Sequence, residues 1–352
     1  MSGDEAALQL ELERAQGLVE LRRYEEATTA LADLVGREPE LAPAWCLLAQ
    51  AQIAVGETQP ALEAANRAVA LAPEHDWPYR LRSVALQQLG DDDGSIAAAR
   101  EAVAAAPHNW QTHRRLAMAL VLAKRDPDGA LAAAGRAIEL APYEPDAFST
   151  LGLVYDMRKN SDEAERCFRH ALSLDPQHAP SHDALARRQL ATSGFGRAGN
   201  LAAAATGFRD AVQADPRDHI AATNIEIVLR AFIARLSYFI FIVAWIAYHV
   251  TGGSAFARVG PLLLLALPVG FAARFLLRLP PDLRRQVRYV AFHGALAVPA
   301  ILQSCALGLL LVAAVLPESA RRKAALAAVL VSLAARVLLY VISRRMRRDH
   351  AA

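Results

Sequence analysis

Cysteine is scarce in this chain of 352 residues, with only three in total. Cys46, Cys167 and Cys305 lie far apart in the sequence, so their spacing indicates neither a disulfide framework nor a metal-binding motif. Isolated thiols are typical of a reducing compartment. Because the cysteine spacing matches no metal-binding motif, we expect no bound metal, and we expect no cofactor.

The sequence also lacks the short motifs that mark common catalytic sites. It contains no glycine-rich phosphate loop, no His-Glu-x-x-His, no Gly-x-Ser-x-Gly and no Cys-x-x-Cys. The acidic run 91–94 lacks the further ligands of a calcium loop, and we interpret it as a solvated turn. The ten histidines pair with no evident nucleophile. We predict that the protein is not an enzyme.

Acidic residues almost disappear from the C-terminal third. Residues 230–352 contain 3 Asp and Glu against 16 Lys and Arg, whereas residues 1–229 contain 33 against 22. An acidic N-terminal part argues against nucleic acid as a ligand, because phosphate binding needs a basic surface. The chain also begins without a basic segment followed by an apolar core, so we expect no cleaved signal peptide.

Regularly spaced prolines are the strongest positive feature. Successive members of the series are 34, 34, 35, 34 and 40 residues apart. A period near 34 is typical of helix–turn–helix repeats that stack into a solenoid. Each proline is expected to end the second helix of its unit, because its ring and missing N–H cannot continue the hydrogen-bond ladder. The series is Pro39, Pro73, Pro107, Pro142, Pro176 and Pro216.

One repeat shows a further pattern of small and large apolar residues. Its small residues allow two helices to approach closely, and its large residues are expected to fill the space between them. The pattern consists of Phe148, Leu151, Gly152, Tyr155, Ala164, Phe168, Ala171 and Pro176. It resembles the tetratricopeptide repeat (TPR) family, and five other units carry parts of it, so the resemblance covers about residues 5–219. The resemblance implies an all-α solenoid of about six helical hairpins.

A solenoid of this family usually binds a protein or peptide on its concave face, which the first helix of each unit lines. Arginines there are suited to a partner carboxylate through paired N–H donors. A tryptophan and a methionine supply apolar anchors. Alternatively, these are solvated residues of exposed helices. The Lys and Asn set that clamps chaperone C-termini in some relatives is missing. The expected binding residues are Trp77, Arg80, Gln87, Arg114, Met118 and Arg187.

After residue 219 the chain becomes strongly apolar. Residues 220–235 contain no Pro or Gly and are expected to form a capping helix that continues into a membrane span. A span needs about 20 apolar residues. Residues 236–342 are therefore expected to hold four transmembrane helices, followed by a basic tail at 343–352. The expected spans are 232–250, 259–277, 290–316 and 324–342.

The basic residues that flank these stretches predict their orientation. Ten of them lie at the entry to the first span, between the second and third spans, and in the tail, while four lie on the opposite side. Positively charged loops face the cytoplasm. We expect a multi-pass protein of the cell membrane, with the repeats and both termini in the cytoplasm and the lipid bilayer as a partner.

Three polar residues stand out within the apolar stretches, namely Arg336, Gln303 and Ser304. Polar residues inside a span are candidates for function. A structural role is the alternative, in which Arg336 bonds to the other two or extends along its helix. No carboxylate lies inside any expected span, which argues against proton-coupled or sodium-coupled transport.

Two functions are compatible with these features. The first is a membrane-anchored TPR scaffold or adaptor that binds a protein or peptide at the cytoplasmic membrane face. The alternative is a small membrane transporter, channel or lipid-handling protein with a regulatory TPR domain, which requires polar residues from several spans to converge. Oligomerisation through small-residue faces such as 324–328 is compatible with both.

Overall fold

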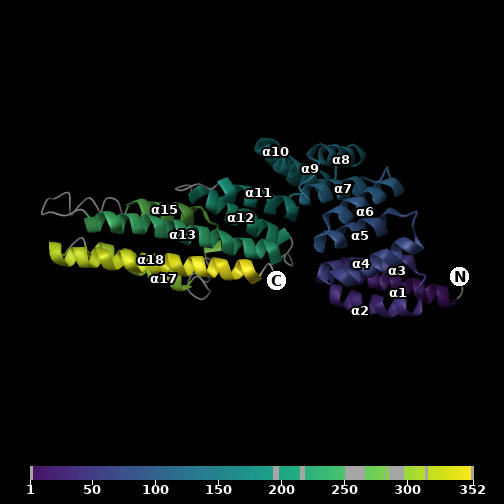
Figure 1. The fold of residues 1–352 in the computed structure, drawn as a ribbon, viewed down its shortest axis with the longest axis horizontal. Helices are drawn as coiled ribbons and strands as arrows, with labels where there is room; N and C mark the ends of the chain where they lie inside the picture. The colour runs from purple at the N-terminus through teal and green to yellow at the C-terminus, as the bar shows by residue number, and fades with distance from the viewer. Residues whose placement is uncertain are drawn as a thin grey trace. The chain divides into compact units, whose positions relative to one another are not determined.

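The structure is a computed structural model that describes residues 3–192, 198–214, 219–249, 266–281, 283–284, 297–313 and 316–349. The chain divides into two compact units, Met1–Pro176 and Gln177–Ala352. All regular elements in the described ranges are α-helices (Figure 1). Each unit is described by itself below.

The first unit consists of helical hairpins stacked in chain order, as Figure 1 shows. Each odd-numbered helix pairs with the even-numbered helix that follows it, and neighbouring hairpins pack against each other. The helices are α1 Gly3–Glu20, α2 Tyr24–Arg37, α3 Ala42–Val55, α4 Thr58–Leu71, α5 Asp76–Gln88, α6 Asp92–Ala105, α7 Trp110–Leu122, α8 Pro127–Leu140, α9 Pro145–Met157 and α10 Ser161–Leu174.

The prolines end the second helix of each hairpin, as the sequence predicts. Pro73, for example, stands two residues after Leu71, the last residue of α4, and the other four units of this part repeat that spacing. Pro216 lies outside the described residues. In the five described units, the helix stops before the proline because a proline contributes no N–H to the hydrogen-bond ladder.

Three proline carbonyls also accept a side-chain hydrogen bond from the next hairpin. Trp45 Nε1 donates to the carbonyl oxygen of Pro39 at 2.9 Å, and Tyr79 Oη donates to that of Pro73 at 3.1 Å. His113 Nε2 lies 2.9 Å from the equivalent oxygen of Pro107. These three side chains are 34 residues apart, so each one ties its helix to the turn before it.

Polar side chains cap several helices at their N-terminal ends. Asp91 accepts a hydrogen bond of 2.8 Å from the backbone N–H of Gly94, and Asp126 accepts one of 2.9 Å from that of Gly129. Such caps satisfy N–H groups that have no partner within the helix. Residues 91–94 therefore form the cap and the first turn of α6. The solvated turn that the sequence predicted corresponds only to the start of this run.

The interior of the first unit is built largely from alanine. Ala61, Ala99 and Ala134 are fully buried. The largest fully buried side chain of this unit is that of Phe168. Phe168 packs over Gly152, where an added Cβ would lie 2.6 Å from the ring. Phe148 and Tyr155, which were expected to fill the space between the helices, are only half-buried, and so is Trp45.

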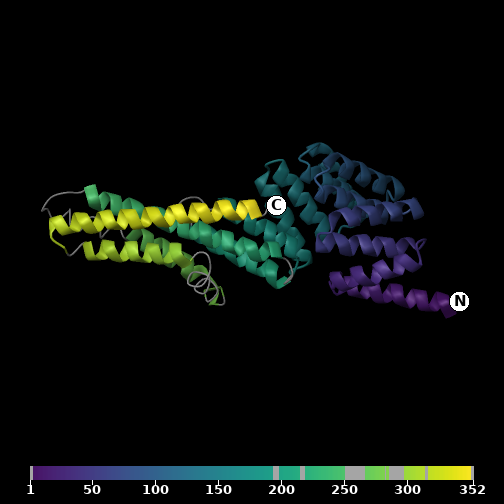
Figure 2. The same ribbon diagram turned by 60° about the horizontal axis from the view of Figure 1, so that its bottom comes forward.

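The second unit begins with a hairpin of α11 Ala179–Thr192 and α12 Ala198–Ala214, at the place of the expected sixth repeat. α13 follows from His219 to His249 as one continuous helix, as expected for a segment without Pro or Gly. The remaining helices are α15 Ala266–Arg278, α17 Ala297–Ala313 and α18 Glu318–Asp349. Figure 2 shows α13, α17 and α18 side by side, with α17 and α18 joined as a hairpin.

Two helices have the length and composition to cross a membrane. They are Ile227–Ile246 in α13 and Ser319–Val341 in α18, at the places of the first and fourth expected spans. Ile301–Val312 in α17 is apolar but shorter. The expected span 259–277 is described only at 266–277, and the expected span 290–316 only at 297–313 and 316. The described residues thus supply two candidate spans, where the sequence predicts four.

Candidate functional site: a groove on three repeat helices

A cavity of about 390 Å³ lies across α3, α5 and α7 in the first unit. These are the first helices of three consecutive hairpins, the helices expected to line a concave face. Four of the six expected binding residues line this cavity, namely Trp77, Arg80, Arg114 and Met118. The other lining residues are Gln50, Ile53, Leu81, Val84, Gln111 and Arg115.

The repeat spacing explains why these side chains meet. Arg80 and Arg114 are 34 residues apart, as are Val84 and Met118, so each pair occupies equivalent positions on neighbouring units. Stacking of units with the same orientation places equivalent side chains in a row. The groove thus presents apolar side chains beside two guanidinium groups.

Each of the two expected arginines already has a carboxylate partner. Arg80 Nε lies 2.6 Å from Oδ2 of Asp76, one helical turn earlier, and Asn109 Nδ2 donates to the same oxygen at 3.1 Å. Arg114 Nη2 lies 3.2 Å from Oδ1 of Asp146. These pairs hold both guanidinium groups in place, and each leaves further N–H donors for a ligand.

Arg115 is a third cation in the groove, which the sequence pattern did not predict. It donates to Oε1 of Gln87 and, at 3.4 Å, to Oγ of Ser95. Burial, reinforced by the positive charge of Arg114, lowers the pKa of Arg115 from 12.5 to about 10. In the sequence, only the position of Arg115 directly after Arg114 indicated that it could enter the groove.

The local charge balance favours an anionic ligand. Three guanidinium groups face two carboxylates, those of Asp76 and Asp146, and the partners of Arg115 are neutral. The Nε atoms of Arg114 and Arg115 are buried without a hydrogen-bond partner. A single carboxylate placed here would balance the charge.

Two of the expected binding residues do not line the groove. Gln87 instead accepts the hydrogen bond from Arg115 and so holds that guanidinium in place. Arg187 belongs to α11 in the second compact unit, where it pairs with Asp183 at 2.6 Å.

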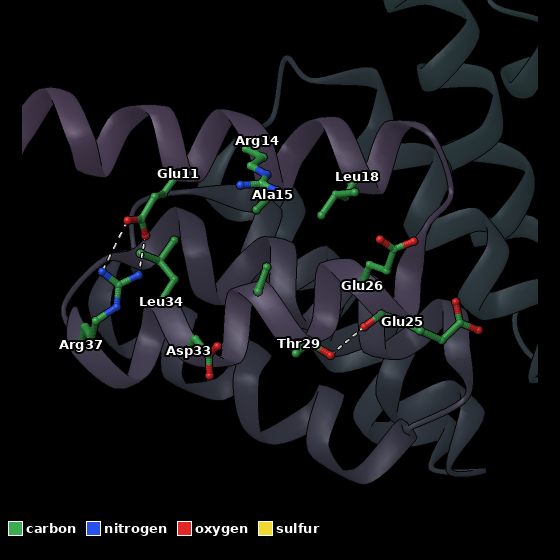
Figure 3. A pocket seen from close by; sticks show the side chains of 11 residues that line it. Glu11, Arg14, Ala15, Leu18, Glu25, Glu26, Thr29, Asp33, Leu34 and Arg37 are labelled. Atoms are coloured by element: carbon green, nitrogen blue, oxygen red, sulfur yellow. Dashed lines mark hydrogen bonds and ion pairs between the residues drawn. The ribbon is translucent and has the colours of Figure 1, made fainter.

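A second and larger cavity, of about 680 Å³, opens between α1 and α2 and was not expected (Figure 3). Arg37 of α2 forms an ion pair with Glu11 of α1 across it, and this contact holds the pKa of Glu11 below its ordinary value. The other charged side chains that line it are Arg14, Glu25, Glu26 and Asp33. Acids therefore outnumber bases in this cavity.

The polar residues of the apolar part occupy two separate places. Gln303 Nε2 donates to Oγ of Ser237 at 2.7 Å, and Ser332 Oγ lies 3.3 Å from Oε1 of Gln303. Ser332 also donates to the carbonyl oxygen of Ser237 at 3.2 Å. All three side chains are buried, so they join α13, α17 and α18 through mutual hydrogen bonds.

Arg336 does not join this cluster, contrary to one of the two alternatives stated above. Its guanidinium lies 5.4 Å from the ring centre of Tyr238 and 5.3 Å from that of Phe241, both on α13. These are cation–π distances. Ser304, beside Gln303 in the sequence, is exposed. Within the described part of the chain, no group of three or more His, Cys, Asp or Glu is placed to hold a metal ion.

Two family models match the first unit. Both describe the tetratricopeptide repeat, and they cover residues 42–75 and 145–178, the hairpins α3–α4 and α9–α10. The first unit resembles the TPR family over these segments. TPR repeats imply a scaffold for protein–protein interaction, and proteins of this kind are generally non-catalytic. No curated protein matches the chain.

Solved TPR structures resemble the chain at low sequence identity. The Cut9–Hcn1 hetero-tetramer of the APC/C is 20% identical over 63% of this chain and 42% of that chain, with a TM-score of 0.50. A thermophilic TPR protein from Thermus thermophilus is 24% identical over 52% of this chain and 99% of that one, with a TM-score of 0.48. PilW, a type IV pilus biogenesis factor, is 18% identical over 63% and 98%, with a TM-score of 0.48. At 20% identity, the likeness to the Cut9–Hcn1 structure concerns the fold alone.

Proposed function

We propose that the protein is a membrane-anchored TPR scaffold that binds a carboxylate-bearing segment of a protein or peptide in the groove of α3, α5 and α7. The observation that carries this proposal is the convergence of Arg80, Arg114 and Arg115 beside Trp77 and Met118 around one cavity. The apolar side chains supply contact area. The excess positive charge supplies selectivity for an acidic side chain or a C-terminal carboxylate.

The membrane part of the proposal rests on the second unit. Its two candidate spans carry 20 and 23 residues with high mean hydropathy. The distribution of Arg and Lys on their flanks favours a cytoplasmic position for the repeats. In this arrangement the scaffold holds its partner next to the inner surface of the membrane.

The transporter or channel alternative gains no support from the polar residues. Gln303, Ser237 and Ser332 do converge, but each is hydrogen-bonded to another member of the cluster and all are buried. Such a cluster suits helix association better than a solute path.

Photocrosslinking in cells tests the groove. A photoreactive residue replaces Met118 in the groove or, as the control, Glu139 on α8, which is exposed and belongs to an outer helix. We expect one dominant product from position 118 that is absent from position 139 and is lost on competition with an acidic peptide. Equal products from both positions would rule out this groove as the binding face.

Carbonate extraction and protease protection of membranes from the same cells test whether the protein is anchored in the membrane. A scaffold of the proposed kind stays in the membrane pellet, and protease added to inside-out vesicles digests its repeats. Release of the full chain into the soluble fraction would contradict the membrane part and leave the groove result standing.

A further inference from the structure

Arg336 places a positive charge inside a candidate membrane span. It belongs to Ser319–Val341, and its guanidinium rests on the rings of Tyr238 and Phe241 of the neighbouring span Ile227–Ile246. At a rise of about 1.5 Å per residue, these two rings lie roughly 8 to 12 Å inside the Ile246 end of that span. The charge is therefore directed into the apolar layer and away from the basic tail.

This chain provides no carboxylate at that depth. Only three acids follow residue 230, and two of them, Glu318 and Asp349, lie roughly 27 and 20 Å away along α18 at about 1.5 Å per residue. The third, Asp282, falls outside both candidate spans and outside the described residues. On α13, Glu226 precedes Tyr238 by about 18 Å at the same rise. Arg336 forms no ion pair with any residue in the described part of the chain.

An exposed apolar surface lies beside Arg336 on α18. Its exposed side chains follow one another at intervals of four and three residues, which places them on one face of the helix. The opposite face of α18 is buried and includes Ala325, Ala328 and Ser332. On α13, the aromatic side chains of Tyr238 and Trp245 are half-exposed as well. The exposed side chains of α18 are Leu326, Leu330, Leu333, Val337 and Tyr340.

We propose that this face of α13 and α18 docks a transmembrane helix of another protein, one that carries an Asp or Glu at the depth of Arg336. The proposal rests on the membrane anchoring proposed above. The carboxylate would neutralise a charge that is otherwise costly inside a bilayer. The apolar side chains of α18 would pack along the remainder of the helix.

The two other possible occupants fit less well. A second copy of this chain brings no carboxylate within its spans, so it leaves Arg336 unpaired. A lipid phosphate lies in the headgroup region, outside the apolar layer in which the guanidinium lies. Ionisable residues inside membranes usually pair with one another in the interior of a bundle.

A reconstitution experiment with a defined probe tests the proposal. The full chain is placed in phosphatidylcholine vesicles with a fluorescent Leu/Ala peptide of ~20 residues that contains one Glu at the depth of Arg336. A matched peptide carries Gln at that position. Energy transfer from the labelled protein measures association. The variants are Arg336→Gln, Arg336→Lys and, as the matched control on the same helix, the exposed Arg322→Gln.

We expect the wild type and Arg322→Gln to prefer the Glu peptide by about 3- to 20-fold, the range of interhelical polar contacts in membranes. Arg336→Gln should lose this preference and Arg336→Lys should keep part of it. Equal association of both peptides with the wild type, or a preference that persists in Arg336→Gln, would overturn the proposal. So would loss of the preference when phosphatidylglycerol is added, because lipid phosphate would then be the occupant.

Insertion of the full chain is measured in the same vesicles by carbonate extraction. A chain that inserts but shows no preference for the Glu peptide contradicts only the docking proposal. A chain that does not insert contradicts the anchoring proposal and the docking proposal together.

Discussion

Gln303 of α17 donates a hydrogen bond of 2.7 Å to the hydroxyl of Ser237 on α13, and both side chains are buried. Ser332 of α18 lies within hydrogen-bond distance of both residues. One amide therefore connects three helices that are far apart in the sequence. Because an apolar environment offers no other partners, the cluster specifies which faces of these helices meet.

Replacement of Gln303 by Leu should destabilise the second unit. The change removes the donor to Ser237 and leaves a buried hydroxyl with fewer partners, at a cost of about 1–2 kcal/mol in the free energy of unfolding. Reversible unfolding in mixed micelles measures this cost. Ser304→Ala, at the exposed neighbouring position, is the control and should change stability by less than about 0.5 kcal/mol. A stable Gln303→Leu protein would show that the cluster contributes little.

Gly152→Ala should destabilise the first unit because its new methyl group would meet Phe168. The added Cβ would lie 2.6 Å from a ring that is fully buried. Overpacking of this kind costs about 1–3 kcal/mol. Gly135→Ala, in α8, is the control, because nothing lies within 4 Å of its new methyl group. It should stabilise by up to about 1 kcal/mol through helix propensity.

Chemical denaturation followed by circular dichroism compares the two glycine variants. If Gly152→Ala were as stable as Gly135→Ala, the contact between Gly152 and Phe168 would not limit the approach of α9 and α10.

The double variant Arg80→Gln, Arg114→Gln should weaken capture of the partner and keep the fold. Glutamine is the better replacement, because a glutamate at position 80 or 114 would face Asp76 or Asp146 directly. Loss of two charge-assisted contacts should lower affinity by about tenfold or more. The control is Arg136→Gln, which removes one arginine that is paired with Glu139 on an outer helix. Undiminished capture by the double variant, measured by crosslinking from position 118, would contradict the assigned face.

Two buried thiols should resist modification in the folded protein. Burial raises the pKa of Cys46 from 9.0 to about 12, against a smaller opposing effect of Arg80, and burial raises that of Cys167 to about 11. At pH 8 both are neutral and enclosed, so an aqueous thiol reagent should react at least about a hundredfold more slowly than in denaturant. Rapid labelling of Cys46 in the native state would contradict its burial.

The same shifts predict a loss of stability at high pH. The folded state favours the neutral thiols, so their contribution is complete below the pKa of an unfolded thiol, about 8.5. It should decline as the pH rises through about 11 for Cys167 and about 12 for Cys46. Cys46→Ala should reduce this decline in a denaturation series between pH 8 and 11, provided that the variant folds.

Local chemistry made the repeat unit predictable. A proline cannot continue the hydrogen-bond ladder of the helix that precedes it, so the series from Pro39 to Pro176 marked five helix ends correctly. Small residues at fixed spacing marked the close contacts, among them Gly152 with Phe168. The stacking of equivalent positions then predicted that Arg80 and Arg114 would line one surface. The sequence could not reveal that Trp45 and Tyr79 tie their helices to proline carbonyls.

By itself, the sequence determined the helical repeats, the register of the groove and the apolar character of the C-terminal part, because each depends on residue type and spacing along one helix. Only the tertiary structure decided that Arg115 enters the groove with Gln87 as its partner, that Gln303 meets Ser237, and that Arg336 rests on two aromatic rings. These contacts join side chains on different helices. Their geometry depends on how the helices pack against each other, which no spacing within a single helix specifies.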